Sequence, residues 1–429
     1  MQVVSPPLHA LPERSVAAHP LNPAIVAVSL TTGHVHLLDT DAGPNAEPLQ
    51  LSSDAAFPVK RGARGIAFSP QGLEVYVAGE SGVLAFAVPS LAALRAGARS
   101  SPRLIVGSLT GRNAGTLAPV PLASASGLDL QSGAEYADVP ALSIVFKLIY
   151  GLAVHPCSGA LYIADRGANT IYIATPPPST APATNEWTVR PLVARLGVTA
   201  ADGPFWLNEP KGLAVSPSGN ALFFSQYHAI IRLDLASLQL TRIAGTKASA
   251  TAPPSAPISA TIPSLLNPSG IALAGDNSIL VCLYSWTVVL SVALTPDAAA
   301  DGVTLDTATA GDMAVSPLPT GSVPSFSSPI TVAALSTGSL AVVEHSIALR
   351  IVPGACAASD PHAHLRRPWS PVSHLAFSLA VRRTIFVVLV IARAVNPATS
   401  DYTYASHCFL PHLPNEILHL IFAHIARAQ

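Results

Sequence analysis

The stretch KGLAVSPSGNALFFSQYHAIIRLDL, residues 211–235, decides the fold. Residues 213–215 are apolar, and residues 216–220 (SPSGN) have the Pro, Gly and Asn residues of a tight turn. Residues 221–225 form a second, mostly apolar run, and residues 230–235 alternate between apolar and polar side chains, as a half-buried strand does. With a further apolar run at residues 240–244, the unit predicts four short antiparallel strands.

The opening phrase of this unit occurs seven times along the chain. Its copies begin at Arg14, Arg64, Tyr150, Lys211, Ser269, Pro329 and Ser373. One such unit cannot bury its own apolar face, and a four-stranded unit repeated every ~40–50 residues is typical of a propeller blade. We therefore predict an all-β chain with a β-propeller of six or seven four-stranded blades over residues 14–395. Seven copies give either seven blades or a ring in which the first and last copies share one blade.

Two glycines stand at the same place in the opening phrase. Gly212 and Gly270 each begin the first strand of a unit. Glycine is expected where backbones approach closely or where φ is unusual. We expect both residues to be structural.

Two copies resemble a known repeat most closely. One matches it at Pro210, Gly212, Leu213, Ala214, Val215 and Gly219, and another at Gly151, Leu152, Ala153, Val154, Gly159, Leu161, Tyr162, Ile163, Ala164, Asp165, Asn169 and Ile171. These residues resemble the NHL repeat, whose pattern is roughly P-x-G-I-A-V-D-x-x-G-x-I-Y-V-A-D-x-x-N-x-R-I. The resemblance covers most of residues 14–395 and implies a β-propeller, usually with six blades. The Gly-His and Trp-Asp signatures of WD-repeat blades do not occur.

Composition argues against several function classes. The chain has 23 Lys and Arg and 24 Asp and Glu residues, a net charge of −1. It therefore exerts no long-range attraction on nucleic acid or an anionic membrane, and its few lysines disfavour RNA binding. The four cysteines form no C-x-x-C pair, which argues against a structural zinc and a disulfide scaffold. We expect no cofactor and no metal.

Targeting signals are not evident in the sequence. The N-terminus has no basic start followed by an apolar run, as a secretory signal has. The most apolar stretch, residues 384–392, is too short to span a bilayer and predicts a buried strand of the last blade. We expect an intracellular monomer, cytoplasmic or nuclear, without a membrane partner.

A candidate binding site follows from the turns after the second strand of each unit. The aligned turns carry Glu80, Asp165, Arg166, Tyr227, His228, Tyr284, Glu344 and His345. Equivalent positions on successive blades lie around one end of the propeller axis, so we predict that these residues line one ligand-binding mouth. No catalytic residue is assigned, since motifs such as G-x-S-x-G, H-E-x-x-H and the P-loop do not occur.

Two functions fit such a propeller. The first is a non-enzymatic scaffold that presents loops to a protein partner. The alternative is a metal-dependent hydrolase or lyase of the gluconolactonase or amidating-lyase kind, which this chain resembles in fold. An enzyme would bring Glu80, Asp165 and Glu344 or His345 together; a scaffold would leave them dispersed, or used as caps of turns, as predicted for Asp165 and Asn169.

Residues 396–429 predict a linker and a C-terminal helix. Ile417, Leu420 and Ile421 form an apolar face at helical spacing. The text also resembles the start of an F-box, L-P-x-E-[IL]-L-x-x-I-F, through Leu413, Pro414, Glu416, Ile417, Leu418, Ile421 and Phe422. That resemblance implies docking on a Skp-type adaptor of an SCF ubiquitin ligase. Only the first F-box helix is found in the sequence, and it follows the propeller rather than preceding it. The alternatives are an amphipathic helix packed on the propeller and a remnant of a truncated reading frame.

Overall fold

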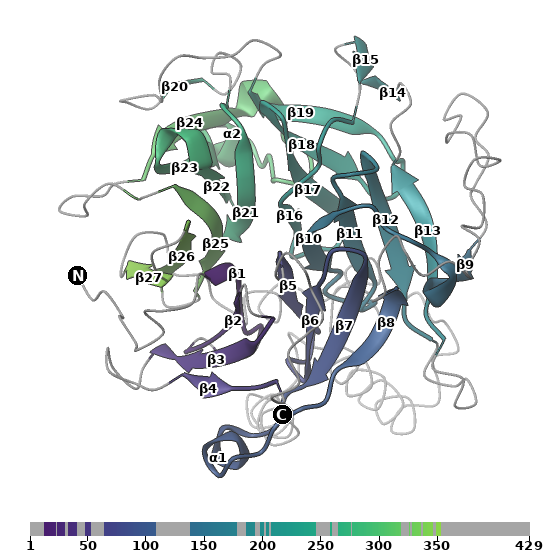
Figure 1. Ribbon diagram of the computed structural model, residues 1–429. Helices are drawn as coiled ribbons and strands as arrows, with labels where there is room; N and C mark the ends of the chain where they lie inside the picture. The colour runs from purple at the N-terminus through teal and green to yellow at the C-terminus, as the bar shows by residue number, and fades with distance from the viewer. Residues whose placement is uncertain are drawn as a thin grey trace, which may run out of the picture.

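Six β-sheets stand like propeller blades around one axis (Figure 1). The computed structural model describes residues 13–22, 24–30, 33–40, 48–52, 64–108, 138–177, 186–193, 198–200, 203–205, 207–245, 258–259, 265–275, 277–318, 326, 328–335, 338–345 and 349–352. The α-helices of these ranges, α1 (Leu91–Arg95) and α2 (Pro296–Ala300), have five residues each. No helix in the described residues combines the length and apolarity needed to cross a membrane.

Each blade is an antiparallel sheet that follows chain order outward from the axis. The first three blades are β1 (Glu13–Ala18), β2 (Ile25–Leu30), β3 (Val35–Asp39), β4 (Leu49–Gln50); β5 (Gly65–Phe68), β6 (Glu74–Ala78), β7 (Gly82–Ala87), β8 (Arg103–Gly107); and β10 (Ile149–Val154), β11 (Leu161–Asp165), β12 (Thr170–Thr175), β13 (Thr188–Val193). The other three are β16 (Leu213–Val215), β17 (Ala221–Gln226), β18 (Ala229–Asp234), β19 (Leu240–Gly245); β21 (Pro268–Ala274), β22 (Ser278–Leu283), β23 (Val288–Leu294), β24 (Met313–Pro317); and β25 (Pro329–Ala334), β26 (Leu340–Glu344), β27 (Leu349–Val352). Short strands β9 (Val139–Pro140) and β20 (Ile258–Ser259) extend the third and fifth sheets, and β14 (Val198–Ala200) pairs with β15 (Gly203–Phe205).

The blade count resolves the alternatives left by the sequence. Six of the seven predicted openings begin within two residues of the start of the inner strands β1, β5, β10, β16, β21 and β25. The first blade consists of four consecutive strands of one copy, so the described ring has six blades. The seventh opening at Ser373, the apolar run 384–392 and the rest of the predicted propeller after residue 352 lie outside the described residues.

The unit at residues 211–235 folds as its sequence predicts. Its turn is closed by Ser216, whose carbonyl accepts from the Gly219 N–H at 2.9 Å and whose Oγ accepts from the Ala221 N–H at 3.0 Å. Gly219 has a φ of 78°, which explains glycine at this position. All six residues of β17 are buried, because both faces of this sheet pack against neighbouring blades.

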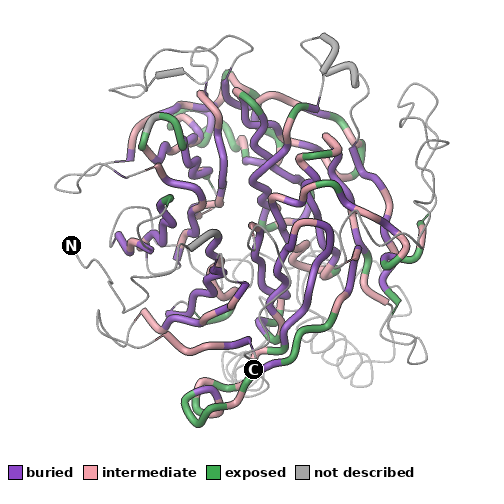
Figure 2. Tube along the Cα trace, in the orientation of Figure 1, coloured by how far each residue is buried: buried purple, intermediate pink, exposed green. Residues whose placement is uncertain are grey.

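The hydrophobic core is divided among the spaces between blades. Each of the six clusters of buried apolar residues is shared by two adjacent blades. Phe223 packs with Ile279 between the fourth and fifth blades, and Val28 with Val343 between the first and sixth. Full burial of such a side chain stabilises the fold by roughly 1.5–3 kcal/mol. Figure 2 shows the buried residues along the strands of every blade.

The inner strands approach one another most closely at the glycines of the opening phrase. A Cβ atom on Gly212 would lie 2.5 Å from the Ser269 carbonyl oxygen, and one on Gly270 would lie 2.6 Å from the Thr331 Cα. The Gly212 N–H also donates to the Ser269 carbonyl at 3.1 Å, which ties two blades together. This close approach is the physical reason for glycine at both positions.

The sheet order gives the axis two different ends. The loops that lead into the inner strands and the turns between second and third strands lie at one end, which we call the axial mouth. The turns between first and second strands lie at the other, which we call the far end.

Candidate functional site

A cavity of about 220 Å³ lies at the axial mouth. Two arginines, a lysine, two tyrosines and a histidine belong to its lining: Arg64, Tyr150, Arg166, Lys211, Tyr284 and His345. They come from five of the six blades. A second cavity of about 250 Å³ follows the inner strands along the axis and is lined by glycine, alanine and other mostly apolar residues. Charged side chains are therefore gathered at the mouth, and among the described residues Arg64 is the one charged residue that lines both cavities.

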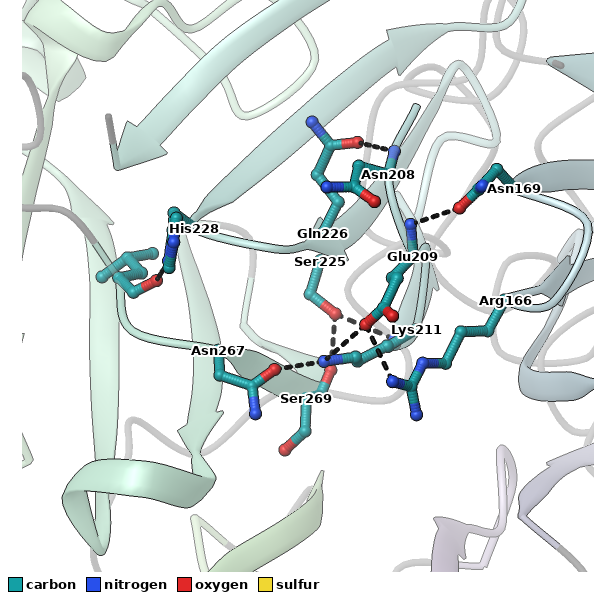
Figure 3. A network of polar contacts seen from close by, with 12 residues as sticks. Arg166, Asn169, Asn208, Glu209, Lys211, Ser225, Gln226, His228, Asn267 and Ser269 are labelled. Carbon is teal, nitrogen blue, oxygen red and sulfur yellow. Dashed lines mark hydrogen bonds and ion pairs between the residues drawn. The ribbon is translucent and has the colours of Figure 1, made fainter. Parts of the chain in front are cut away.

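Lys211 is a buried cation at the centre of the polar network in Figure 3. Its side chain is 4% exposed; Nζ donates to Asn267 Oδ1 and lies 3.9 Å from Glu209 Oε2. Burial, with Arg166 nearby, lowers the pKa of Lys211 to about 8, although Glu209 opposes the shift. Desolvation disfavours the charged form of a lysine, so this ammonium depends on its partners.

Glu209 is shared between two cations. Its Oε2 accepts from Arg166 Nη2 at 2.8 Å and also faces Lys211 (Figure 3). The Tyr150 ring lies next to two guanidinium groups, with the Cζ of Arg64 5.3 Å and that of Arg166 5.7 Å from its centroid. Both distances suit cation–π attraction, so the ring helps to hold the two arginines at the cavity.

Backbone strain is concentrated at the axial mouth. The described non-glycine residues with positive φ are Asn169, Glu209, Leu238, Asn267, Thr287 and Ser328, and all except Leu238 lie in mouth loops or turns. Left-handed backbone costs such residues about 1–2 kcal/mol each. The Glu209 N–H donates to Asn169 Oδ1 at 2.7 Å, which helps to fix this conformation. The strained backbone directs the side chains of Glu209 and Asn267 at Lys211.

Asp165 is buried and closes a turn. It is 1% exposed. One carboxylate oxygen accepts from the Lys147 N–H at 2.8 Å, and the other accepts from those of Leu148 and Ala168 at 2.9 and 3.0 Å. The cap predicted for this residue is thus present, and its oxygens are used by backbone donors.

The other predicted acids also stay apart. Glu344 is 1% exposed and lies 3.1 Å from Arg350 Nη2. Glu80 is half-buried, and its backbone carbonyl accepts from the Ile149 N–H at 3.0 Å. No group of three or more His, Cys, Asp and Glu residues in the described ranges is placed to hold a metal ion. Glu80, Asp165 and Glu344 therefore do not form one cluster of possible metal ligands within the described ranges.

Aromatic and histidine pairs form the rim of the mouth. Tyr284 is 37% exposed and meets His345 edge-on at 5.6 Å, and both line the cavity. Tyr227 is 50% exposed, and its ring centroid lies 4.0 Å from that of His228. The Asn267 N–H donates to the Tyr227 carbonyl at 3.2 Å, which connects this pair to the cavity. Of the eight predicted site residues, Arg166, Tyr284 and His345 line the cavity together.

Sequence reasoning missed Arg64, Tyr150 and Lys211. Each stands directly before the glycine of an opening phrase. The glycine is constrained by the neighbouring strand, so the residue before it lies at the mouth and is free to vary between blades. The residue before the opening glycine could therefore have been used, together with the turn after the second strand, to predict Arg64 and Lys211 from the sequence.

These sheets define the chain as a six-bladed β-propeller. The sequence matches no protein-family model and no curated protein. The fold is similar to that of a structural genomics protein of unknown function from Bacteroides thetaiotaomicron VPI-5482, with a TM-score of 0.50 and 12% identity over 80% of this chain and 69% of that one. It is also similar to an auxiliary nutrient binding protein from the same organism, with a TM-score of 0.50 and 10% identity over 80% of this chain and 68% of that one. At such identities the likeness concerns the fold alone.

Proposed function

We propose that this chain is a non-enzymatic β-propeller scaffold that binds a protein partner at its axial mouth. The observation that carries the proposal is the exposure of Tyr227 and Tyr284 beside a cavity that contains Arg166 and Lys211. Tyrosine and arginine are enriched among the residues that dominate protein–protein binding energy. An amphipathic rim around a charged cavity supports a protein partner that covers the whole mouth.

The arrangement of the acids supports binding over catalysis. Asp165 is occupied by backbone donors, and Glu344 is paired with Arg350. In addition, the fold can serve binding, since one structural neighbour is described as a nutrient binding protein. A propeller's function is set by its site and not by its fold, so the axial mouth is where the proposal must be tested.

Affinity capture with three full-length baits tests the proposal. The baits are the wild type, Tyr227→Ala/Tyr284→Ala, and Leu73→Ala as the matched control, since Leu73 is 66% exposed but lies at the far end. We expect a protein that wild type and control recover equally and that the double variant recovers roughly tenfold less, the effect of about 1.4 kcal/mol of lost binding energy. Equal recovery by all three baits would remove the axial mouth from partner binding.

The resemblances at the sequence level add a finer proposal. NHL-like blades with an F-box-like tail fit a substrate-binding subunit of an SCF-type ubiquitin ligase. The tail residues Leu413 to Phe422 lie outside the described residues, so their spacing supports this link by sequence alone. A pull-down of the Skp-type adaptor with the full chain, a chain ending at Pro411, and Ile417→Asp tests it. Recovery by the full chain only is expected; equal recovery by all three, or by none, rejects the link.

A further inference from the structure

The lining of the axial mouth carries an excess of positive charge. Arg64, Arg166 and Lys211 line one cavity, and the described residues of that lining include no Asp or Glu. The buried acids next to this region are engaged elsewhere: Asp165 by three backbone N–H groups and Glu344 by Arg350. Glu209 supplies the negative charge that contacts two of these cations, Arg166 and Lys211.

One carboxylate is shared by two cations at this place. Glu209 Oε2 lies 2.8 Å from Arg166 Nη2 but 3.9 Å from Lys211 Nζ, so its shorter contact is with the arginine. Lys211 Nζ also donates a hydrogen bond to the amide oxygen of Asn267, which is neutral. A lysine that is 4% exposed and shares its carboxylate is thus incompletely neutralised within the chain.

The donors around the cavity match the chemistry of an oxyanion. Guanidinium groups donate in a planar fork that fits carboxylate and phosphate, and a lysine adds a compact charge. Contacts with the Tyr150 ring hold Arg64 and Arg166 beside the same cavity. The volume of about 220 Å³ lies below the ~300–1,000 Å³ of pockets for drug-sized ligands, so it suits a small group and not a large molecule.

We infer that the axial mouth is an oxyanion site, which takes the carboxylate or phosphate group of the bound partner. The inference rests on the proposed function for the source of the anion. Arg166 and Lys211 contact the anion, which competes with the carboxylate of Glu209. Tyr227 and Tyr284 contact the part of the partner that carries it.

Calorimetric titration of the full chain with succinate and with inorganic phosphate tests the inference. Both are measured at constant ionic strength against a chloride control, and the stronger of the two identifies the group. We expect saturable binding of at least one, weakened by roughly tenfold or more in Lys211→Met and in Arg166→Gln, since each loses a charge-assisted hydrogen bond. Arg103→Gln, a surface arginine paired with Glu74 outside the cavity, is the matched control and should bind as wild type does.

Glu209→Gln gives the sharpest outcome, because removing the competing charge should tighten anion binding by roughly threefold. Melting curves of each variant show that weaker binding does not come from unfolding. Absence of saturable binding to wild type, or equal affinities of wild type and the Lys211 and Arg166 variants, would overturn the inference. If the tyrosine variant still loses a partner in the capture experiment, only the anion site fails; if anions bind but capture is unchanged, only the proposed function fails.

Discussion

The far end and the axial mouth form their turns with different residues at positive φ. At the far end five of the six blades place glycine there: Gly72, Gly159, Gly219, Gly275 and Gly338. The axial mouth also contains positive-φ glycines, but it adds Glu209, Asn267 and Ser328, each directly before a proline. Glycine adopts this backbone without steric cost, whereas the other residues do not. Strain retained by polar residues at the axial mouth supports the proposal that this end binds the partner.

The two ends also differ in how their polar side chains are hydrogen-bonded. At the far end His155 Nδ1 accepts from the backbone N–H groups of Cys157 and Ser158, and its Nε2 contacts the Gly219 carbonyl at 3.1 Å. His19 closes the corresponding turn of the first blade with two similar bonds. The ring nitrogens of these two far-end histidines thus contact neutral backbone groups, while Lys211 at the mouth shares its carboxylate with Arg166.

The largest effect is expected from a substitution that disrupts the close packing of the inner strands, which support both ends. Gly212→Val places side-chain atoms where the Ser269 carbonyl and the Ile271 nitrogen already lie 2.5 and 2.6 Å from a Cβ. Because both obstacles are backbone atoms, we expect a loss of about 3 kcal/mol in unfolding free energy. Thermal melting measures it. Gly311→Ala, where a Cβ meets only an ordinary contact at 3.6 Å, should melt like wild type; an unchanged curve for Gly212→Val would refute the packing argument.

The next largest effect is a pH dependence of stability that comes from Lys211 at the axial mouth. The pKa of Lys211 is lowered to about 8, so the folded chain loses this proton at a lower pH than the unfolded chain. Unfolding then takes up a proton, and the unfolding free energy should rise by about 1.5 kcal/mol between pH 8 and pH 9.5 from this residue alone. Urea denaturation at both pH values should show the rise in wild type and not in Lys211→Met. Identical pH dependence of the two proteins would show that Lys211 is not the titrating group.

Anion binding at the mouth should weaken over the same pH range, because Lys211 loses its charge.

A smaller effect of the same sign is expected at the far end, at lower pH. Burial lowers the pKa of His155, although its bond to the Gly219 carbonyl opposes the shift. The unfolded chain therefore binds a proton first, and stability is lost as pH falls below about 6.5. His155→Ser copies the Ser216-Pro217 turn and should lie within about 1 kcal/mol of wild type at pH 7.5.

The loss of stability between pH 7 and pH 5 should be shallower in His155→Ser than in wild type, with His19 and His36 still contributing to both proteins. Urea denaturation at pH 7, 6 and 5 measures this difference. Parallel curves for the two proteins would contradict a titrating role for His155.

The smallest effect concerns neither end. Arg103 and Glu74 form an ion pair at 3.0 Å with side chains 45% and 32% exposed. Exposed pairs contribute about 0–1 kcal/mol, so Arg103→Gln should lower stability by no more than about 0.5 kcal/mol. Melting curves and anion titration should both match wild type. A clear loss of anion affinity would show that the charge at the mouth is a long-range property of the molecule.

The sequence predicted the frame better than the site, for physical reasons. The alternation at residues 230–235 and the turn at residues 216–220 are local patterns, and β18 and the Gly219 turn follow from them. Which side chains meet at the axis depends on how blades pack, which no single repeat contains. Asp165 was therefore placed at the right turn, but its oxygens point to backbone donors at Lys147 and Leu148, 17–18 residues upstream.

The joint between the first and sixth blades has a consequence for how the chain folds. In the described residues no strand is shared across this joint, and it is held by side-chain packing such as that of Val16 against Ala333, about 300 residues away in sequence. Contacts of such long range form slowly, because the loop must close before they contribute. During synthesis one apolar face of the first blade therefore stays exposed to solvent until the sixth blade has been made. We expect this joint to gain hydrogen-exchange protection last on refolding, and an incomplete chain to be most prone to aggregation there.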